Sequence, residues 1–191
     1  MTRFAPSGPL RGTLRPPPDK SISHRAALIA AMGEGATAVE GYLDAADSRA
    51  ALDAVQALGA EVEEVRPADA TGGSDLRVRG IGLRGPGERF AAGSGPVTIG
   101  VENAGTLLRI LPGWLAGQDG GSWVLDGDDS IRRRPVDRVA EPLRLMGAKV
   151  ECREGRLPPL RVDGSALHGV TYELPAISTH DLTWALATGS S

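Results

Sequence analysis

The feature that most constrains the fold of this chain is an internal repeat. The matched segments are Arg25 with Arg109, Gly33 with Gly117, Leu58-Gly59-Ala60 with Met146-Gly147-Ala148, and Leu76-Arg77-Val78 with Leu160-Arg161-Val162. Their spacings are 84, 84, 88 and 84 residues. Self-similarity at a nearly constant spacing is typical of a supersecondary unit that is repeated along the chain. We therefore expect an α/β (α+β) fold made of equivalent units that pack against one another.

Hydrophobic periodicity predicts the order helix, strand, helix, strand, strand in each unit, or βαβαββ when an entry strand is counted. The expected elements of the first unit are a helix from 19–21 to Gly33, a strand over 37–42, a helix from Asp47 or Ser48 to Gly59, and strands over 61–65 and 76–79. Those of the second are a helix from 103–105 to Gly117, a strand over 122–127, a helix from Pro135 to Gly147, and strands over 149–153 and 159–163. We also expect a short strand over 8–15 and a glycine-rich link over 80–100.

A third unit begins at about 170–174, with Ser178-Thr179-His180 at the start of its first helix. The chain stops at Ser191, shortly after this point. Repeat units bury their apolar faces against each other, so an incomplete unit leaves apolar surface uncovered. We therefore expect that the chain is truncated relative to its native fold.

Composition narrows the class of protein. A net charge of −3 and a pI near 5.6 disfavour a nucleic-acid-binding protein, which would show a basic excess. Cys152 is the single cysteine, which excludes an internal disulfide and is typical of a reducing compartment. No apolar run reaches the ~18 residues of a membrane span, and His24, His168, His180 and Cys152 lack the spacing of metal ligands. We expect a cytoplasmic protein without metal or cofactor.

The start of the first helix is a candidate anion site. Pro16-Pro17-Pro18 disfavours helical backbone, so the helix begins at about Asp19 to Ser21, both good N-cap residue types. A helix N-terminus attracts phosphates and carboxylates through its unpaired N–H groups and its dipole. Lys20 is one of only two lysines among 21 basic residues, and a guanidinium does not replace its compact charge. An ordinary capped surface helix is the alternative interpretation.

Equivalent helix starts recur in the repeats, at Lys20-Ser21, at Asn103-Ala104-Gly105-Thr106 and at Ser178-Thr179-His180. If the units pack about a pseudo-threefold axis, the three N-termini converge on one small ligand with several negative charges. Arg25, Arg109 and the 132–134 cluster would add charge, and Gly105 would allow close backbone approach. The alternatives are that Arg132 and Arg133 are solvated, that Arg25 and Arg109 extend from their helices to solvent, and that His24 is a capping or surface residue.

Three blocks of the sequence resemble one known family. They are Asp19-Lys20-Ser21-Ile22-Ser23-His24-Arg25, Asn103-Ala104-Gly105-Thr106 with Arg109, and Gly127-Asp128-Asp129-Ser130 leading to Arg134-Pro135. They are similar to the signature blocks of the 3-phosphoshikimate 1-carboxyvinyltransferases, also called 5-enolpyruvylshikimate-3-phosphate synthases, in register from about residue 8 to 178. The resemblance implies the enolpyruvyl transferase fold, an inside-out α/β barrel in which each of two domains packs three βαβαββ units. It places residues 1–18 with the second domain, and 19–191 in an incomplete domain with repeats at about 19–100, 101–168 and, in part, 169–191.

The resemblance also implies an activity and a set of residues. The enzyme transfers the enolpyruvyl group of phosphoenolpyruvate to the 5-hydroxyl of shikimate 3-phosphate, as a monomer without a cofactor. The implied roles are catalysis and contact with both substrates for Lys20, binding of shikimate 3-phosphate for Ser21, Arg25, Ser178, Thr179 and the residue at His180, and binding of phosphoenolpyruvate for Asn103, Gly105, Thr106 and Arg134. The acid–base carboxylates of the family lie in the other domain, so this chain alone is expected to be inactive.

The sequence departs from the family pattern at three places. Pro18 replaces the usual glycine, and Glu102 stands where a small residue usually precedes the Asn-Ala-Gly-Thr block. His180 replaces a glutamine that touches the shikimate phosphate, and we expect no family likeness over 181–191. A reading-frame slip or an artificial terminus is our hypothesis for this last stretch.

Two other functions remain open. One is the related UDP-N-acetylglucosamine enolpyruvyl transferase, which shares the fold but lacks the Lys-Ser-x-Ser-x-Arg run and uses a loop cysteine unlike Cys152 in context. The other is a catalytically inactive half-domain that only binds anions.

Overall fold

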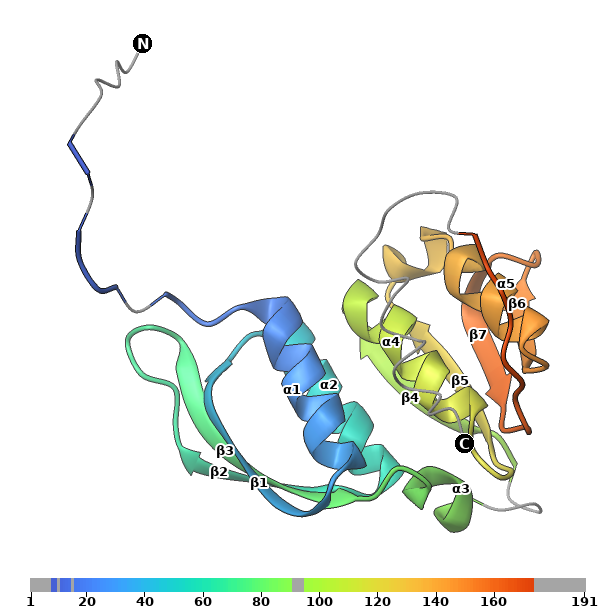
Figure 1. The fold of residues 1–191 in the computed structure, drawn as a ribbon, viewed down its shortest axis with the longest axis horizontal. Helices are drawn as coiled ribbons and strands as arrows, with labels where there is room; N and C mark the ends of the chain where they lie inside the picture. Colours follow the sequence, from blue (N-terminus) through green and yellow to red (C-terminus); the bar gives the residue numbers. More distant parts are fainter. Residues whose placement is uncertain (1–7, 10, 15, 91–94, 174–191) are drawn as a thin grey trace.

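Two sheets, one from each repeat, form the framework of the molecule (Figure 1). The computed structural model describes residues 8–9, 11–14, 16–90 and 95–173. In the first sheet the strands β1 (Glu34–Leu43), β3 (Gly73–Ile81) and β2 (Glu61–Arg66) lie side by side in that order. In the second sheet the order is β4 (Val97–Glu102), β5 (Ser122–Gly127), β7 (Leu157–Asp163) and β6 (Lys149–Arg153). The helices are α1 (Lys20–Met32), α2 (Ala46–Leu58), α3 (Gly85–Arg89), α4 (Gly105–Ala116) and α5 (Asp137–Leu145), with a 3₁₀ turn over Ile131–Arg133.

The strand pairing confirms two units of one design. β1-β3-β2 and β5-β7-β6 have the same order, and every pair within them is antiparallel. Even the register agrees, because Thr37 lies opposite Val78 in the first sheet and Trp123 lies opposite Val162 in the second. Val78 and Val162 are 84 positions apart, which is the spacing of the sequence repeat.

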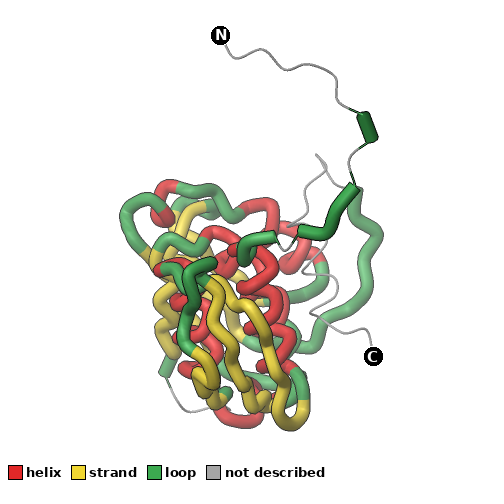
Figure 2. Tube along the Cα trace, turned by 90° about the vertical axis from the view of Figure 1, so that its left-hand side faces the viewer, coloured by secondary structure: helices red, strands yellow, loops and turns green. Residues whose placement is uncertain are grey.

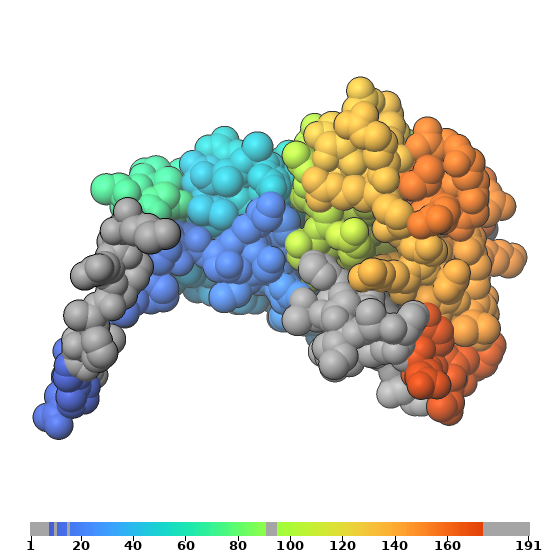
Figure 3. Space-filling view, turned by 90° about the horizontal axis from the view of Figure 1, so that it is seen from above, coloured from blue at the N-terminus to red at the C-terminus, as the bar shows by residue number. Residues whose placement is uncertain are grey.

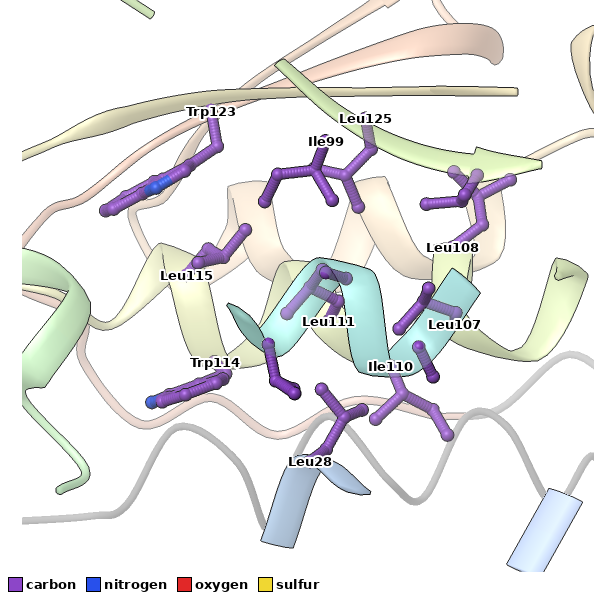
Figure 4. Close-up of a cluster of buried hydrophobic side chains, with 14 of the residues drawn as sticks. Leu28, Ile99, Leu107, Leu108, Ile110, Leu111, Trp114, Leu115, Trp123 and Leu125 are labelled. Atoms are coloured by element: carbon purple, nitrogen blue, oxygen red, sulfur yellow. The ribbon is translucent and has the colours of Figure 1, made fainter. Parts of the chain in front are cut away.

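Helices α1, α2 and α4 lie between the two sheets (Figure 1). α1 packs on β1 and β3, whereas α2 contacts β2 of the first sheet and β4 of the second. Figure 2 looks onto the first sheet, with the helices behind its strands. Figure 4 shows Leu28 of α1 beside Ile110 and Leu111 of α4, and all three side chains are buried. The core is mostly Ala, Leu, Val and Ile, as the low aromatic content predicts, although Trp114 and Trp123 are also fully buried.

In each unit the predicted start of the second helix is wrong. α2 begins at Ala46, because the Ser48 hydroxyl reaches back from inside the first turn and accepts from the Ala45 N–H at 3.1 Å. α5 begins at Asp137, two residues after Pro135. Val136 precedes it with its N–H donated to the Arg156 carbonyl at 2.8 Å, which holds this residue outside the helix.

Three segments differ from their predicted structure. Of residues 8–15, those that are described form no strand, since they have no partner strand to pair with. The glycine-rich link over 80–100 contains α3 and the start of β4. Residues 170–173, at the start of the predicted third unit, have no regular structure.

Gln118, just after α4, holds the link in place. Its amide nitrogen donates to the carbonyls of Leu83 at 3.0 Å and Trp114 at 2.8 Å, and its oxygen accepts from the Gly87 N–H at 3.1 Å. Gln118 is 1% exposed, so these bonds are shielded from water. The connection between the two units is therefore anchored to the second unit.

The described ranges contain no helix that is long and apolar enough to cross a membrane. A search of the same residues finds no group of three or more His, Cys, Asp or Glu side chains arranged to hold a metal ion.

The close approach of α1 to β3 gives a first prediction. A Cβ added at Gly80 would collide with the backbone carbonyl oxygens of Gly33 and Ala30 at the end of α1. Because backbone oxygens cannot turn aside, we expect Gly80→Ala to lower the free energy of unfolding by about 1–3 kcal/mol. Urea denaturation measures the change. Gly95→Ala is the matched control, since nothing lies within 4 Å of its added methyl, and an equally stable Gly80→Ala would contradict the packing.

Candidate anion-binding site

The start of α1 is capped as its sequence predicts. Asp19 is the N-cap, and its carboxylate accepts from the Ile22 N–H at 2.8 Å. The residue before it, Pro18, lies against β3, where its Cγ is 3.0 Å from the position of a Cβ on Gly73. This proline therefore packs where the chain enters the helix.

Lys20 forms an ion pair that its motif does not reveal. Its Nζ donates to Asp47 Oδ2 at 2.7 Å, across 27 residues of sequence. This hydrogen bond is the main reason that the pKa of Asp47 lies below its usual range. Because Lys20 is 48% exposed, the pair itself contributes only ~1 kcal/mol or less to stability. The chief effect of the ion pair is to set the direction of the Lys20 ammonium group at the N-terminus of α1, which we call the mouth of this helix.

Two further side chains of α1 hold the turn that leads into α2. Ser23 Oγ accepts from the Leu43 N–H at 3.0 Å, and His24 Nε2 donates to the Asp47 carbonyl at 2.9 Å. His24 is fully buried, so its interpretation as a capping or surface residue is wrong. Since a carbonyl can only accept, the proton is on Nε2, and the buried Nδ1 has no hydrogen-bond partner among the residues that the structure describes. Burial lowers the pKa of His24, which stabilises the neutral ring.

The start of α4 brings three of the predicted residues together. Arg134 Nη2 donates to Asn103 Oδ1 at 3.0 Å and to Ser130 Oγ at 2.9 Å. A Cβ on Gly105 would lie 2.8 Å from Arg134 Nη1 and 3.4 Å from Arg109 Nη1. Two guanidinium groups therefore flank the bare backbone at the first residue of this helix. Thr106 follows it and is 9% exposed.

Glu102 enters this turn with a left-handed backbone, at φ 46°. Its carbonyl accepts from the Asp128 N–H at 3.0 Å, and a Cβ on Gly127 would collide with that oxygen. A left-handed residue other than glycine costs about 1–3 kcal/mol, so Glu102 keeps this backbone at a cost that glycine would avoid.

Arg25, Arg109 and Arg132 have local partners. Arg25 donates to the Ser21 carbonyl at 3.0 Å, and Arg109 donates in the same way to the Gly105 carbonyl at 3.3 Å. The two repeats therefore share this side-chain arrangement, four residues back along each helix. Arg132 pairs with Asp126 at 2.7 Å and lowers the pKa of that carboxyl. Arg132 and the neighbouring Arg133 are exposed, as the alternative interpretation predicts.

The two described helix mouths open at the same end of the molecule. In Figure 1 both α1 and α4 begin at the top, and the two helices are in contact. Figure 3 views this end, where the surface of α1 lies next to that of α4. Ser178, Thr179 and His180, the third predicted mouth, lie outside the described residues. A separate cavity of about 270 Å³ lies between α2 and the first sheet and contains none of the predicted site residues.

The buried His24 gives a prediction about pH. An unfolded histidine takes up a proton below pH ~6.5, whereas burial, Lys20 and Arg25 all oppose a charge on folded His24, and Asp47 only partly offsets them. The unfolded state therefore binds more protons, and stability should fall as the pH drops from 7.5 towards 5. Urea denaturation across this range should show a smaller fall for His24→Asn. His168→Asn, an exposed control, should keep the full response, and identical slopes for all three proteins would rule out the role of His24.

Comparison with known proteins identifies the family of the chain. A sequence model of EPSP synthase (3-phosphoshikimate 1-carboxyvinyltransferase) matches residues 4–188, so the likeness extends past residue 181, contrary to our expectation. The chain is 47% identical over 177 residues to 3-phosphoshikimate 1-carboxyvinyltransferase of Thermus thermophilus, covering 92% of this chain and 38% of that one. It is 44% identical to the enzyme of the same name from Alkalilimnicola ehrlichii, covering 91% and 36%.

A solved structure has the same fold. EPSP synthase from Acinetobacter baumannii superposes with a TM-score of 0.77 at 33% identity, over 93% of this chain and 38% of that one. The chain thus spans less than two fifths of the length of these relatives. The matched sequence, the repeated unit and the superposed fold together show that the chain belongs to the EPSP synthase (3-phosphoshikimate 1-carboxyvinyltransferase) family.

Proposed function

We propose that this chain forms part of an enzyme that transfers the enolpyruvyl group of phosphoenolpyruvate to the 5-hydroxyl of shikimate 3-phosphate. The observation that carries the proposal is the pair of helix N-termini, α1 and α4, that open at one end with Lys20, Arg109 and Arg134 beside them. Helix N-termini and cationic side chains together suit ligands with several negative charges. Family membership supplies the identity of those ligands.

The proposed roles divide between the two mouths. Lys20, Ser21 and Arg25 would hold the phosphate of shikimate 3-phosphate, together with the segment 178–180. Asn103, Gly105, Thr106 and Arg134 would line the phosphoenolpyruvate pocket. Because Asp47 already accepts from Lys20, a bound anion must share this ammonium with the carboxylate. Lys20 is the one group of this chain that we assign to both substrates and to catalysis.

The chemistry needs fixed positive charge more than any reactive side chain of this domain. The 5-hydroxyl loses its proton as its oxygen adds to C2 of phosphoenolpyruvate and C3 takes a proton. Phosphate then leaves C2 as C3 gives up a proton, which restores the C2–C3 double bond. Two anionic substrates must be held side by side while this intermediate forms. Preorganised cations and N–H groups lower the energy of such an arrangement, and orientation lowers it further. Both contributions come from side chains and backbone N–H groups that the fold holds before the ligand arrives.

The chain spans only part of such an enzyme, and its proposed role is correspondingly partial. We propose that residues 19–191 belong to one domain and that 1–18 associate with the other, which carries the acid–base carboxylates. We also propose that the whole enzyme is monomeric and cytoplasmic, and that this chain alone binds ligand without turnover.

The position and burial of Cys152 argue against the alternative function, UDP-N-acetylglucosamine enolpyruvyl transferase. This cysteine lies on β6 rather than on a loop, and it is half-buried. Burial raises the pKa of its thiol, which lowers the population of the reactive thiolate. Cys152 is therefore a poor candidate for the loop cysteine that the alternative requires.

Ligand titration of the chain tests the proposal. Added shikimate 3-phosphate should shift the amide NMR signals of residues 19–25, and Lys20→Met should weaken binding tenfold or more, because a charge-assisted hydrogen bond contributes about 1.5–3 kcal/mol. Lys149→Met removes the only other lysine and should leave binding unchanged. No shift with the wild-type chain, or equal losses in the two variants, would contradict the assignment. Phosphate release by the chain alone would show that the second domain is not needed.

Gly105→Ala tests the assignment of the second mouth. The added methyl would lie 2.8 Å from Arg134 Nη1, so the guanidinium must move from its present place beside the helix start. In an enzyme completed with the second domain, we expect KM for phosphoenolpyruvate to rise by more than KM for shikimate 3-phosphate. Gly169→Ala, with open space around its added methyl, should change neither. Equal increases in KM for the two substrates would show that Gly105 serves only as a turn residue.

A further inference from the structure

Arg134 is held at one of its nitrogens by two acceptors. Its Nη2 donates to Asn103 Oδ1 at 3.0 Å and to Ser130 Oγ at 2.9 Å, so both hydrogens of this nitrogen are used. Within the described part of the chain, no residue accepts a hydrogen bond from Nη1 of the same guanidinium. Nη1 lies 2.8 Å from the position of a Cβ on Gly105, the first residue of α4. The two acceptors therefore leave Nη1 available to donate at the start of this helix.

Ser130 lies in a turn that fixes its own position. The Asp128 carboxylate accepts from the Ile131 N–H at 2.8 Å, and the Ile131 side chain is fully buried in the core. The Asp128 N–H donates to the carbonyl of Glu102 at 3.0 Å, which joins the turn to the end of β4, directly before Asn103. Backbone contacts therefore hold both acceptors of the guanidinium in place before a ligand binds.

The first unit has the reverse arrangement of charge. There the segment after β1 supplies the acid, Asp47, and the start of α1 supplies the cation, Lys20, with 2.7 Å between them. In the second unit the segment after β5 supplies the cation, Arg134, on a long side chain that must reach the start of α4. An arginine side chain has many rotamers, so a ligand that must order it binds more weakly than one that finds it in place.

We propose that Ser130 is a positioning residue for the binding of phosphoenolpyruvate. Together with Asn103 it holds the Arg134 guanidinium so that Nη1 meets the anion at the start of α4, and the ligand does not have to order this side chain. Ser130 acts through Arg134 and does not contact the substrate. This inference rests on the proposed function, which assigns Arg134 to the phosphoenolpyruvate pocket.

The first test needs no ligand. NMR signals of arginine side chains report how fast each guanidinium rotates about its Nε–Cζ bond, and Arg134→Lys identifies the signals of Arg134. We expect slow rotation of Arg134 in the 191-residue chain, faster rotation in Ser130→Ala, and slow rotation again in Ser130→Thr, which keeps the hydroxyl. Ser165→Ala is the matched control, since the Ser165 hydroxyl donates to the Gly147 carbonyl instead. Equal rotation of Arg134 in the wild-type chain and in Ser130→Ala would overturn the proposal.

The second test uses an enzyme completed with the second domain. Ordering one long side chain costs the ligand roughly a two- to tenfold loss of affinity, so Ser130→Ala should raise KM for phosphoenolpyruvate by about this factor. KM for shikimate 3-phosphate should stay unchanged, and Ser130→Thr should restore KM for phosphoenolpyruvate. In an Arg134→Ala background, Ser130→Ala should have no further effect, because the two residues act as one unit. A further rise in that background would show direct contact with the substrate and would overturn the positioning role.

The proposed function and the positioning role fail in different ways. If Arg134→Ala leaves KM for phosphoenolpyruvate unchanged, the assignment of the α4 mouth is wrong, and the role of Ser130 falls with it. If Arg134→Ala raises this KM and Ser130→Ala does not, Arg134 binds phosphoenolpyruvate without help from Ser130, and only the positioning role is overturned. Equal rises in KM for both substrates in Ser130→Ala would show a general loss of structure and would also overturn it.

Discussion

The contacts between α1 and the turn before α2 are the interaction on which the candidate site depends. Lys20, Ser23 and His24 lie on one face of α1, three and four residues apart, and all three contact the segment from Leu43 to Asp47. The His24 side chain is fully buried, whereas the Lys20 side chain is 48% exposed. The buried His24 side chain therefore helps to hold Asp47 in place. The Asp47 carboxylate in turn orients the Lys20 ammonium group, which solvent and ligand can reach.

The second mouth is built differently, although it occupies the equivalent place in the repeat. Its cations come from α4 itself and from the segment after β5, and Asn103 and Ser130 hold Arg134 in place. Glu102 takes a left-handed backbone directly before it. Strain of this kind persists where the surrounding structure compensates for it, and here the Glu102 carbonyl is fixed by the Asp128 N–H. The repeated unit thus provides one scaffold, and the N-termini of α1 and α4 on it carry different charged side chains.

Much of the framework is predictable from local signals. The spacing of apolar residues and the glycines that end helices indicate α1, α4 and β5 to within a residue or two, because these features act within a few positions of each other. The start of α2 is mispredicted, since Ser48 caps from inside the helix. The link over 80–100 is also mispredicted, because Gln118, distant in sequence, holds it in place.

The sequence by itself determined the repeated unit, the two described helix mouths and the family, because each depends on residues close together or on a spacing repeated along the chain. Only the tertiary structure decided that Lys20 pairs with Asp47, that His24 is buried, and that β3 is the one strand paired with β1 in the described part of the chain. The reason is physical: burial and pairing depend on which distant segment packs against a residue. The sequence of a motif is the same whether its histidine or lysine faces solvent or a neighbouring helix.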